Sequence, residues 1–287
     1  MKLSIITINY NNFDGLRRTM DSVIDQTWKD FEYIVIDGGS QDGSKDIISS
    51  RREHLAHWVS EPDTGIYNAM NKGIAQAQGE YCLFLNSGDF LVDTNALAQA
   101  FKNHFDSDIV SFALINTDRK TSFLNRPPHE ISLYSFVNSS LSHPSTFIKR
   151  SLFDLIGYYD ESYKIISDWI FFINALIINK CTYTAYDSPL SIFDRSGSSI
   201  STENSEYIKK ECIHYLNDRF PLIWKDINMP EAYMNALFYL CNESSPILKN
   251  FCLLHLKIIN RVLRLRNKLR KKISVDSIRF SFPDQNA

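Results

Sequence analysis

The first hundred residues repeat one pattern: a short apolar run, a polar cluster, then a stretch with helical spacing. The apolar runs lie at residues 3–8, 31–36, 58–59 and 81–85. The stretches with apolar side chains three or four apart lie at residues 14–26, from Ser44 onward, and at 66–78. Strands that alternate with helices in this way predict a parallel α/β sheet, with Asp14 as a candidate cap of the first helix.

Polar residues follow each predicted strand at the point where the strand ends. Asn9 and Tyr10 follow the first, Asp37 ends the second, and Asp89 follows the run at 81–85. Open α/β sheets bind ligands in the crevice beyond the carboxyl ends of their strands. We therefore expect these side chains to share one edge. The Gly-rich turn after Asp37 is neither a Walker A loop nor GxGxxG, so it also fits a plain tight turn.

The pattern loosens after residue 105. We expect a strand at 109–115, loops over 117–142, order again at 143–148, and helix from about residue 204 to 273. The predicted domains are an α/β domain at 1–203, with halves at 1–100 and 101–203, and a helical extension at 204–287.

Asp168 lies in the strongly apolar stretch 153–178. A carboxylate is costly to bury unless it is paired or used, which favours a role as general base. The alternative is that Asp168 caps the helix that follows, with help from Ser167. His143 stands alone, without partners at metal-ligand spacing, and a lone histidine is more often structural.

Residues 61–73 are dense in polar groups around a helix start. Asn68, Asn71 and Lys72 are three and four residues apart and so share a helix face, where two amides and an ammonium suit a diphosphate. A capped surface helix, with Asp63 or Thr64 as the cap, is the simpler explanation. Asp89 is a candidate ligand for Mn²⁺ or Mg²⁺, which favour oxygen donors.

The charge is unevenly distributed. The chain carries 31 basic and 33 acidic residues, yet residues 244–275 hold basic residues and no Asp or Glu. Within this part, residues 247–273 predict a basic amphipathic helix, either lying on an anionic membrane surface or packing on the catalytic domain. The total charge and the lack of interleaved aromatics argue against nucleic acid. No apolar stretch is long enough to span a bilayer, and the cysteine spacing signals neither zinc nor disulfides.

Taken together, several segments resemble the family 2 glycosyltransferases of bacterial surface-polysaccharide pathways, of the colanic-acid and O-antigen type. They are Ser-Ile-Ile-Thr-Ile-Asn-Tyr-Asn (4–11), Val-Ile-Asp-Gly-Gly-Ser-Gln-Asp-Gly (35–43), Ser-Glu-Pro-Asp-Thr-Gly-Ile-Tyr-Asn-Ala-Met-Asn-Lys-Gly-Ile (60–74), Phe-Leu-Asn-Ser-Gly-Asp (84–89), His-Pro-Ser-Thr-Phe (143–147) and Tyr-Asp-Glu-Ser-Tyr-Lys-Ile-Ile-Ser-Asp-Trp (159–169). Their order covers about residues 3–200, and the remainder matches nothing.

The resemblance implies a GT-A fold: a mixed, mainly parallel Rossmann-like sheet flanked by helices. It implies that 1–203 is the catalytic domain, with a nucleotide-sugar-binding half at 1–100 and an acceptor-binding half at 101–203. It also implies a nucleotide-sugar donor, UDP by default, a divalent metal and inversion at the anomeric carbon. A lipid-linked glycan acceptor would place the protein in the cytoplasm, on the inner face of the membrane. The implied donor-binding residues are Thr7, Asn9, Tyr10, Asp37, Asp63, Asn68, Asn71, Lys72 and Ser87. Asp89 is implied as the metal ligand and Asp168 as the base, and His143, Trp169 and Ser198 are acceptor or loop candidates.

The sequence departs from the family pattern in two places. The first position of the acidic metal motif is Ser87, or Asn86 if one residue shifts, and the position two beyond Asp168 is Ile170. A non-catalytic nucleotide-sugar-binding or assembly protein on the same scaffold is therefore the alternative. A nucleotidyltransferase is less favoured, because the loop after the first strand lacks the usual glycines and basic residue. Oligomeric state leaves no signature in the sequence.

Overall fold

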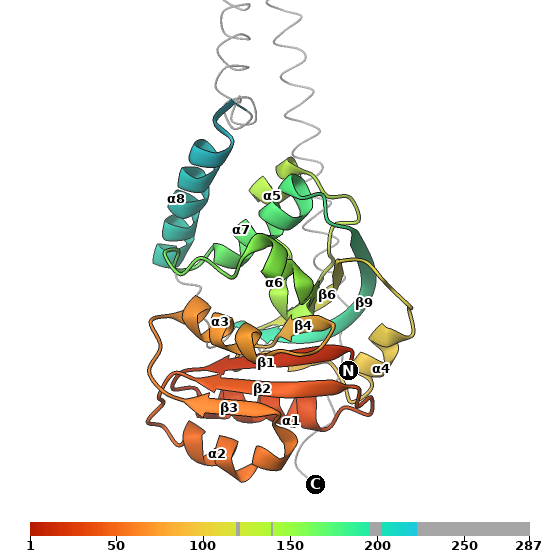
Figure 1. Ribbon diagram of the computed structural model, residues 1–287, viewed down its shortest axis with the longest axis vertical. Coiled ribbons are helices and arrows are strands. Elements are labelled where there is room, and N and C mark those ends of the chain that lie inside the picture. The colour runs from red at the N-terminus through yellow and green to blue at the C-terminus, as the bar shows by residue number, and fades with distance from the viewer. Residues whose placement is uncertain (119–120, 139, 196–201, 223–287) are drawn as a thin grey trace, which may run out of the picture. The chain divides into compact units, whose positions relative to one another are not determined.

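The protein is described from a computed structural model, which covers residues 1–118, 121–138, 140–195 and 202–222 (Figure 1). In these ranges nine strands form one sheet. They are β1 (Leu3–Asn9), β2 (Phe31–Asp37), β3 (His57–Ser60), β4 (Tyr81–Phe84), β5 (Phe90–Leu91), β6 (Ile109–Thr117), β7 (Ser122–Asn125), β8 (Thr146–Lys149) and β9 (Tyr183–Asp194).

The helices of the described ranges lie between and beyond these strands. The α-helices are α1 (Phe13–Ile24), α2 (Ser44–Ser50), α3 (Ile66–Gln76), α4 (Ala96–Phe101), α5 (Leu133–Asn138), α6 (Ser151–Ile156), α7 (Ser167–Ile173) and α8 (Thr202–Arg219). Two short 3-10 helices, η1 (Arg52–His54) and η2 (His143–Ser145), and the π-helical turn η3 (Asn174–Ile178) complete the set.

The first half of the sheet is parallel, as the sequence predicts. Its strand order is β3-β2-β1-β4, with a parallel ladder at each step. The ladders pair Asn9 with Asp37 and Asp37 with Ser60, so three polar residues stand side by side at the carboxyl ends of the strands. The expected shared edge is confirmed for these strands. Asn12, not Asp14, caps α1, because the Asn12 side chain accepts a hydrogen bond from the N–H of Gly15.

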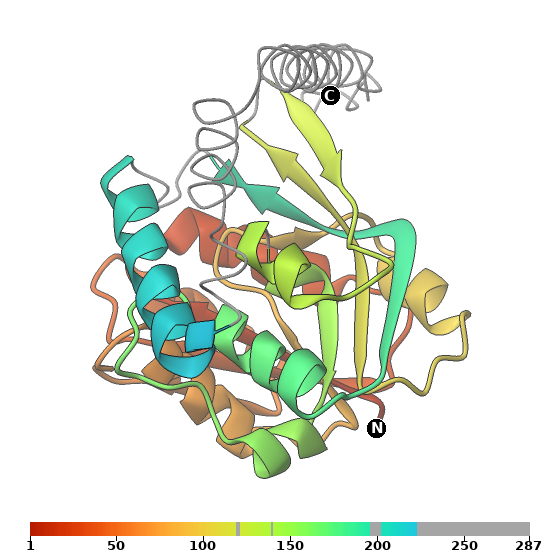
Figure 2. The ribbon, with the colours of Figure 1, turned by 90° about the horizontal axis from the view of Figure 1, so that it is seen from above.

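The second half of the sheet is mixed and more irregular. β8 pairs antiparallel with β4 and β6, and β9 runs parallel to β6 with a register shift near Ala113 (Figure 2). The prediction of loops over 117–142 is partly wrong, since β7 and α5 lie in that stretch. β7 is short and is held by its antiparallel ladder with β6, a partner that its own residues do not reveal.

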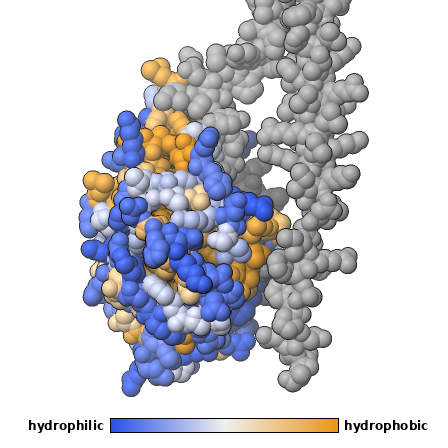
Figure 3. Space-filling model, turned by 90° about the vertical axis from the view of Figure 1, so that its right-hand side faces the viewer, coloured by the Kyte–Doolittle hydropathy of each residue, from blue (hydrophilic) through white to orange (hydrophobic). Residues whose placement is uncertain are grey.

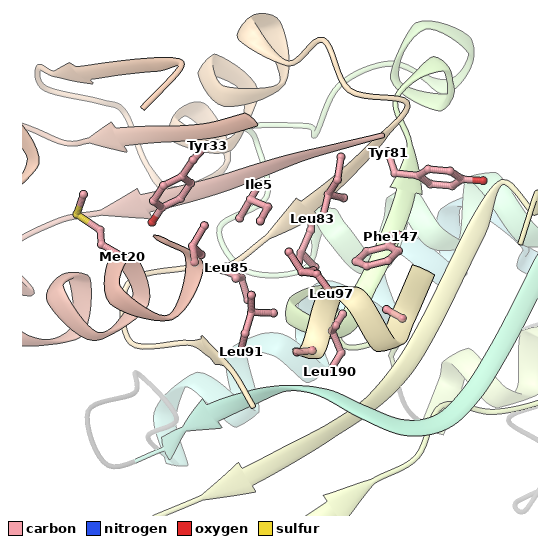
Figure 4. Packing of buried hydrophobic residues seen from close by; sticks show 14 of the residues in the cluster. Ile5, Met20, Tyr33, Tyr81, Leu83, Leu85, Leu91, Leu97, Phe147 and Leu190 are labelled. Carbon is pink, nitrogen blue, oxygen red and sulfur yellow. The ribbon is translucent and has the colours of Figure 1, made fainter. Parts of the chain in front are cut away.

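The core forms where the two faces of the sheet meet different helices. On one face Ile5 and Leu83 pack with Met20 of α1 and Leu97 of α4 (Figure 4). On the other face α3 lies close to the strands, because a Cβ at Gly73 would stand 2.4 Å from Cγ2 of Ile6. Alternate residues of parallel strands point to opposite faces, and helices cover both faces here, which is why β1 and β2 are buried along almost their whole length and are mainly apolar.

The surface of the described part is mixed. Figure 3 shows one face, on which hydrophilic residues cover much of the area and hydrophobic residues form separate patches. Within the described residues, no helix combines the length and the apolar character that crossing a membrane requires.

Contacts divide the chain into two compact units, Met1–Glu211 and Cys212–Ala287. The predicted domain division at residue 203 falls near the start of α8, and it stays a prediction. The predicted basic helix at 247–273 and the candidate Ser198 lie outside the described residues.

Candidate active site

A cleft of about 1180 Å³ opens at the carboxyl edge of the parallel strands. Its walls come from the segments after β1, β2, β3 and β4 and from the end of β9. Of the sequence-predicted site residues, it is lined by Asn9, Tyr10, Asp63, Ser87 and Asp89. The topology thus brings together polar residues from across the first 89 positions, as expected for the crevice of an α/β sheet.

Asp37 lies fully buried beneath this cleft, and its carboxylate is saturated with hydrogen bonds. Oδ1 accepts from Asn9 Nδ2 at 2.7 Å and from the Ser40 hydroxyl at 2.5 Å. Oδ2 accepts from the Ser60 hydroxyl at 2.7 Å and the Ser40 N–H at 2.9 Å. Burial acts to raise the pKa of Asp37, but the hydrogen bonds from Ser40, Ser60 and Asn9 outweigh it and hold the pKa below its ordinary value.

Asn9 connects the buried Asp37 to the cleft, because it binds Asp37 and also lines the cleft. Its Nδ2 is bound to Asp37, while its buried Oδ1 has no hydrogen-bond partner in the structure. An unpartnered buried acceptor is costly, and here it belongs to a residue that lines the cleft. It is therefore available to an N–H or O–H donor of a ligand.

Tyr10 and Asp63 form one edge of the cleft, close to Gly38. A Cβ on Gly38 would stand 2.7 Å from Asp63 Oδ2 and 3.1 Å from Cδ2 of Tyr10, so the glycine makes this close approach possible. The Tyr10 side chain is 68% exposed, and Asp63 Oδ1 accepts from the N–H of Gly65 at 3.1 Å. Gly65, rather than Asp63 or Thr64, precedes α3 as its cap residue.

Asp89 lies in the tight turn that follows β4. Its Oδ2 accepts from the Asn86 N–H at 3.2 Å, and its own carbonyl accepts from the Thr19 hydroxyl at 2.6 Å. Thr19 and Asn12 of the α1 region hold the turn, with Asn12 Nδ2 bonded to the Ser87 carbonyl at 2.8 Å. Burial raises the pKa of Asp89 to about 7, although the nearby His143 opposes the rise.

The surroundings of Asp89 fit a divalent cation held mainly by substrate. No cluster of three or more His, Cys, Asp or Glu side chains within the described ranges is arranged to hold a metal ion by itself. Mg²⁺ is commonly bound through one or two carboxylates together with substrate phosphates. Asp89 is a buried carboxylate at the cleft wall that makes no ion pair within the described part of the chain, and such a group is suited to that arrangement.

Asp168 lies in the first turn of α7, 17% exposed. The Tyr67 hydroxyl, which also contacts the carbonyl of Ile165, lies 2.9 Å from Asp168 Oδ1. His143 Nδ1 lies 3.4 Å from Asp168 Oδ2. The capping alternative is wrong: Ile166 is the cap residue, and the hydroxyl of Ser167 is buried without a partner.

His143 joins the surroundings of Asp168 to the turn that carries Asp89. Its Nε2 lies 3.2 Å from Asn86 Nδ2, and the Asn86 N–H binds Asp89. Burial lowers the pKa of His143, but the hydrogen bond and charge of Asp168, with the charge of Asp89, raise it above the ordinary value. The solitary histidine thus has carboxylates on both sides, which its sequence context did not indicate.

Other predicted residues are engaged elsewhere. Asn68 and Asn71 donate to the Glu161 carboxylate at 3.0 and 2.9 Å, and Lys72 Nζ lies 2.8 Å from Glu61. None of these three predicted residues is among those lining the cleft. Two further candidates are buried: the Thr7 hydroxyl lies 3.0 Å from that of Tyr33, and Trp169 Nε1 donates to the Phe136 carbonyl at 2.9 Å.

Arg18 and Asp194 line the cleft but were not predicted. Arg18 Nη1 lies 2.8 Å from Asp194 Oδ2, and Asp194 is nearly buried. Arg18 lies one helical turn after Asp14 on α1, so a search for charged residues on the first helix would have found it. Asp194, at the end of β9, has no local signal. The charged residues of the lining are Asp14, Arg18, Asp63, Asp89 and Asp194, so acidic groups predominate.

The cleft and its carboxylates lie where an open α/β sheet binds its ligand, and comparisons with known proteins identify the family. The profile of glycosyl transferase family 2 matches residues 4–171. The chain belongs to this family and is a glycosyltransferase. This outcome supports the enzyme over the non-catalytic alternative.

Relatives and solved structures agree. An uncharacterised glycosyltransferase of Mycobacterium tuberculosis is 36% identical over 68% of this chain and 76% of its own length. A PGL/p-HBAD biosynthesis glycosyltransferase of Mycobacterium bovis is 31% identical over 72% and 82%. The fold resembles S. aureus TarS in complex with UDP-GlcNAc, at a TM-score of 0.58 and 20% identity over 76% and 67%. It also resembles PcManGT of Pyrobaculum calidifontis in complex with GDP-Man and Mn²⁺, at 0.56 and 17% over 90% and 80%. The predicted GT-A fold is confirmed.

Proposed function

We propose that this glycosyltransferase inverts the anomeric centre as it moves a sugar from a nucleoside-diphosphate donor, with UDP favoured, to a hydroxyl of a lipid-linked glycan. The observation that carries the proposal is the carboxylate of Asp168. It is partly exposed and is contacted on both oxygens by Tyr67 and His143. A base fixed in this way suits in-line attack by an acceptor hydroxyl.

The residues divide the work between donor and acceptor. Asn9, Tyr10 and Asp63 contact the nucleoside in the cleft, and Asp37 orients Asn9 from below. Asp168 takes the proton of the acceptor hydroxyl as its oxygen bonds to the anomeric carbon and the bond from that carbon to the diphosphate breaks. Asp89, with Ser87 beside it, would hold Mn²⁺ or Mg²⁺. Such an ion stabilises the charge of the leaving diphosphate.

Arg18 and Lys72 are the two candidate cations for binding the diphosphate. Arg18 already lines the cleft. Lys72 would reach the diphosphate only by leaving Glu61, and Asn68 and Asn71 only by leaving Glu161. Trp169 supports the acceptor side from within α7. The acidic lining favours a donor that arrives with a divalent cation, because the anionic diphosphate would otherwise face like charges.

The proposed class of glycan product is based on the name of one relative. One relative is named for PGL/p-HBAD biosynthesis, and we extend from it to a cell-surface glycan or glycolipid as the product. A surface polysaccharide of the colanic-acid or O-antigen type falls within that class. A lipid-linked acceptor also gives a reason for the basic segment 247–273, which we propose lies on the anionic inner leaflet of the membrane. Vesicles with and without anionic lipid test this, and equal binding to both would contradict it.

The decisive test is Asp168→Asn, with Asp154→Asn on the exposed surface of α6 as the matched control. We measure hydrolysis of UDP-glucose, UDP-galactose, UDP-N-acetylglucosamine and GDP-mannose with Mn²⁺, water serving as acceptor. Asp168→Asn should lower the rate about 10²- to 10⁴-fold. Its thermal shift with the matching nucleotide should stay at the wild-type value. An unchanged rate, or a retained anomeric configuration in the released sugar by NMR, would overturn the assignment.

A further inference from the structure

The side chain of His143 lies between the start of helix α7 and the turn after β4, which are far apart in the sequence. On one side its Nδ1 lies 3.4 Å from Asp168 Oδ2, and on the other its Nε2 lies 3.2 Å from Asn86 Nδ2. The contact with Asn86 spans 57 residues of sequence. With 22% of its side chain exposed, His143 is mostly enclosed between α7 and the turn after β4.

We propose that His143 is a positioning residue for the base: through Nδ1 it fixes the carboxylate of Asp168 in the orientation that receives the acceptor proton. The proposal rests on the function of Asp168 proposed above. The proposal goes beyond that function because it gives His143 the role of orienting the base, whereas the sequence offered His143 as an acceptor or loop candidate.

The two contacts on Asp168 explain why the histidine is needed. Tyr67 reaches only Oδ1, from α3, and leaves the carboxylate free to turn about its bond to Cβ. His143 reaches Oδ2 from η2, so the two oxygens are held from different elements. An ionised carboxylate has about four acceptor positions, so each oxygen retains capacity for a substrate hydroxyl.

Asn86 keeps the imidazole in the orientation that serves Asp168. With Asn86 Nδ2 facing the ring, Nε2 accepts and Nδ1, the nitrogen 3.4 Å from Asp168 Oδ2, carries the proton. The Oδ1 of Asn86 is buried and has no partner. If the amide reverses, Oδ1 faces an Nε2–H instead, and Nδ1 stays on the side of Asp168. The same neighbour therefore holds the ring whether the imidazole is neutral or charged.

The test compares three substitutions at His143 by the donor hydrolysis assay with Mn²⁺. His143→Ala should lower kcat on the order of 10²-fold, the typical cost of a misplaced catalytic group, with the donor KM unchanged. His143→Asn puts an amide N–H near the position of Nδ1 and should recover most of kcat. His143→Gln reaches toward Asn86 but not Asp168, so it should behave like the alanine variant.

Two controls separate positioning from general damage. His129 makes a similar contact with Asp187, at 3.1 Å, on the exposed surface and away from Asp168, so His129→Ala should leave kcat unchanged. Added to Asp168→Asn, His143→Ala should cost little more, because a residue that acts through Asp168 has nothing left to position. Nucleotide thermal shifts should match wild type in every variant that is folded.

The outcomes distinguish this proposal from the function on which it rests. If wild type hydrolyses no donor, or Asp168→Asn hydrolyses at the wild-type rate, the proposed function fails and the role of His143 falls with it. If Asp168→Asn is inactive but His143→Ala changes only KM, only the positioning role is overturned. Rescue by glutamine and not by asparagine would also overturn it, because His143 would then act on the turn of Asp89.

Discussion

The segments at the ends of β2 and β4 place two buried carboxylates, Asp37 and Asp89, at the same edge of the sheet, but their surroundings shift the two pKa values in opposite directions. Asp37 accepts four hydrogen bonds, and these keep its pKa below the ordinary value despite burial. Among the described residues, the carboxylate of Asp89 accepts one hydrogen bond, from the backbone N–H of Asn86, and burial raises its pKa to about 7. A carboxylate supplied with donors holds the fold together, whereas one left short of them is suited to a cation that arrives with substrate.

Among the variants that test this contrast between Asp37 and Asp89, the largest effect should come from Asp89→Asn. It keeps the shape of the side chain but loses the charge that would hold the metal, which supplies several kcal/mol of transition-state stabilisation. We expect donor hydrolysis to fall on the order of 10²-fold or more, and the Mn²⁺-dependent part of the nucleotide thermal shift to vanish. Asp93→Asn, on the exposed surface nearby, serves as the control. Full Mn²⁺-dependent activity in Asp89→Asn would remove the contrast between the two carboxylates.

Asp37→Ala should act on folding first. It leaves the amide of Asn9, two serine hydroxyls and a backbone N–H without their acceptor. A buried group left unpaired costs about 1–3 kcal/mol, so we expect the free energy of unfolding to fall by roughly 3 kcal/mol after partial relaxation. Urea denaturation measures it. A loss of activity with no loss of stability would instead mean that Asp37 contacts the substrate directly.

Arg18 and Lys72 should differ in how much each contributes to donor binding. Arg18 lines the cleft, and loss of its charged hydrogen bonds to a diphosphate should raise the donor KM about tenfold in Arg18→Gln. Lys72→Met removes a partly exposed ion pair with Glu61, which is worth at most about 1 kcal/mol. Steady-state kinetics of both variants decide between them. A larger rise in KM for Lys72→Met would show that Lys72 turns into the cleft and would restore its sequence-predicted role.

Much of the parallel half was predictable because its signals are local. Each strand of β1 to β4 is a short, mainly apolar run that is followed closely by polar residues, and the carboxylates Asp37, Asp89 and Asp168 lie at or soon after such apolar stretches. β7 was missed, since a four-residue strand depends on its partner β6 and not on its own composition. The contacts between site residues could not be predicted from the sequence either. Tyr67 and Asp168 are 101 residues apart, and nothing local to either residue indicates the other.

The smallest effect should be the acid sensitivity that Asp37 confers. Its pKa in the folded protein is below the ordinary value of 3.8, so the folded state binds its proton less readily than the unfolded chain. The stability it contributes is therefore complete above the unfolded pKa and is lost as the pH falls through the folded one. A single group changes the free energy of unfolding by at most about 1.4 kcal/mol per pH unit. Asp42, Asp108 and Glu161 also have lowered pKa values and add to the same acid loss.

The contribution of Asp37 is isolated by subtracting the stability of Asp37→Asn from that of wild type at each pH. The difference should be constant from pH 7 to about pH 5 and shrink as the pH falls below 4, because protonation makes the wild-type side chain neutral as well. Denaturation curves at half-unit steps measure it. A difference that grows on acidification would mean that the hydrogen bonds around Asp37 favour its protonated form, and the contrast with Asp89 would then disappear.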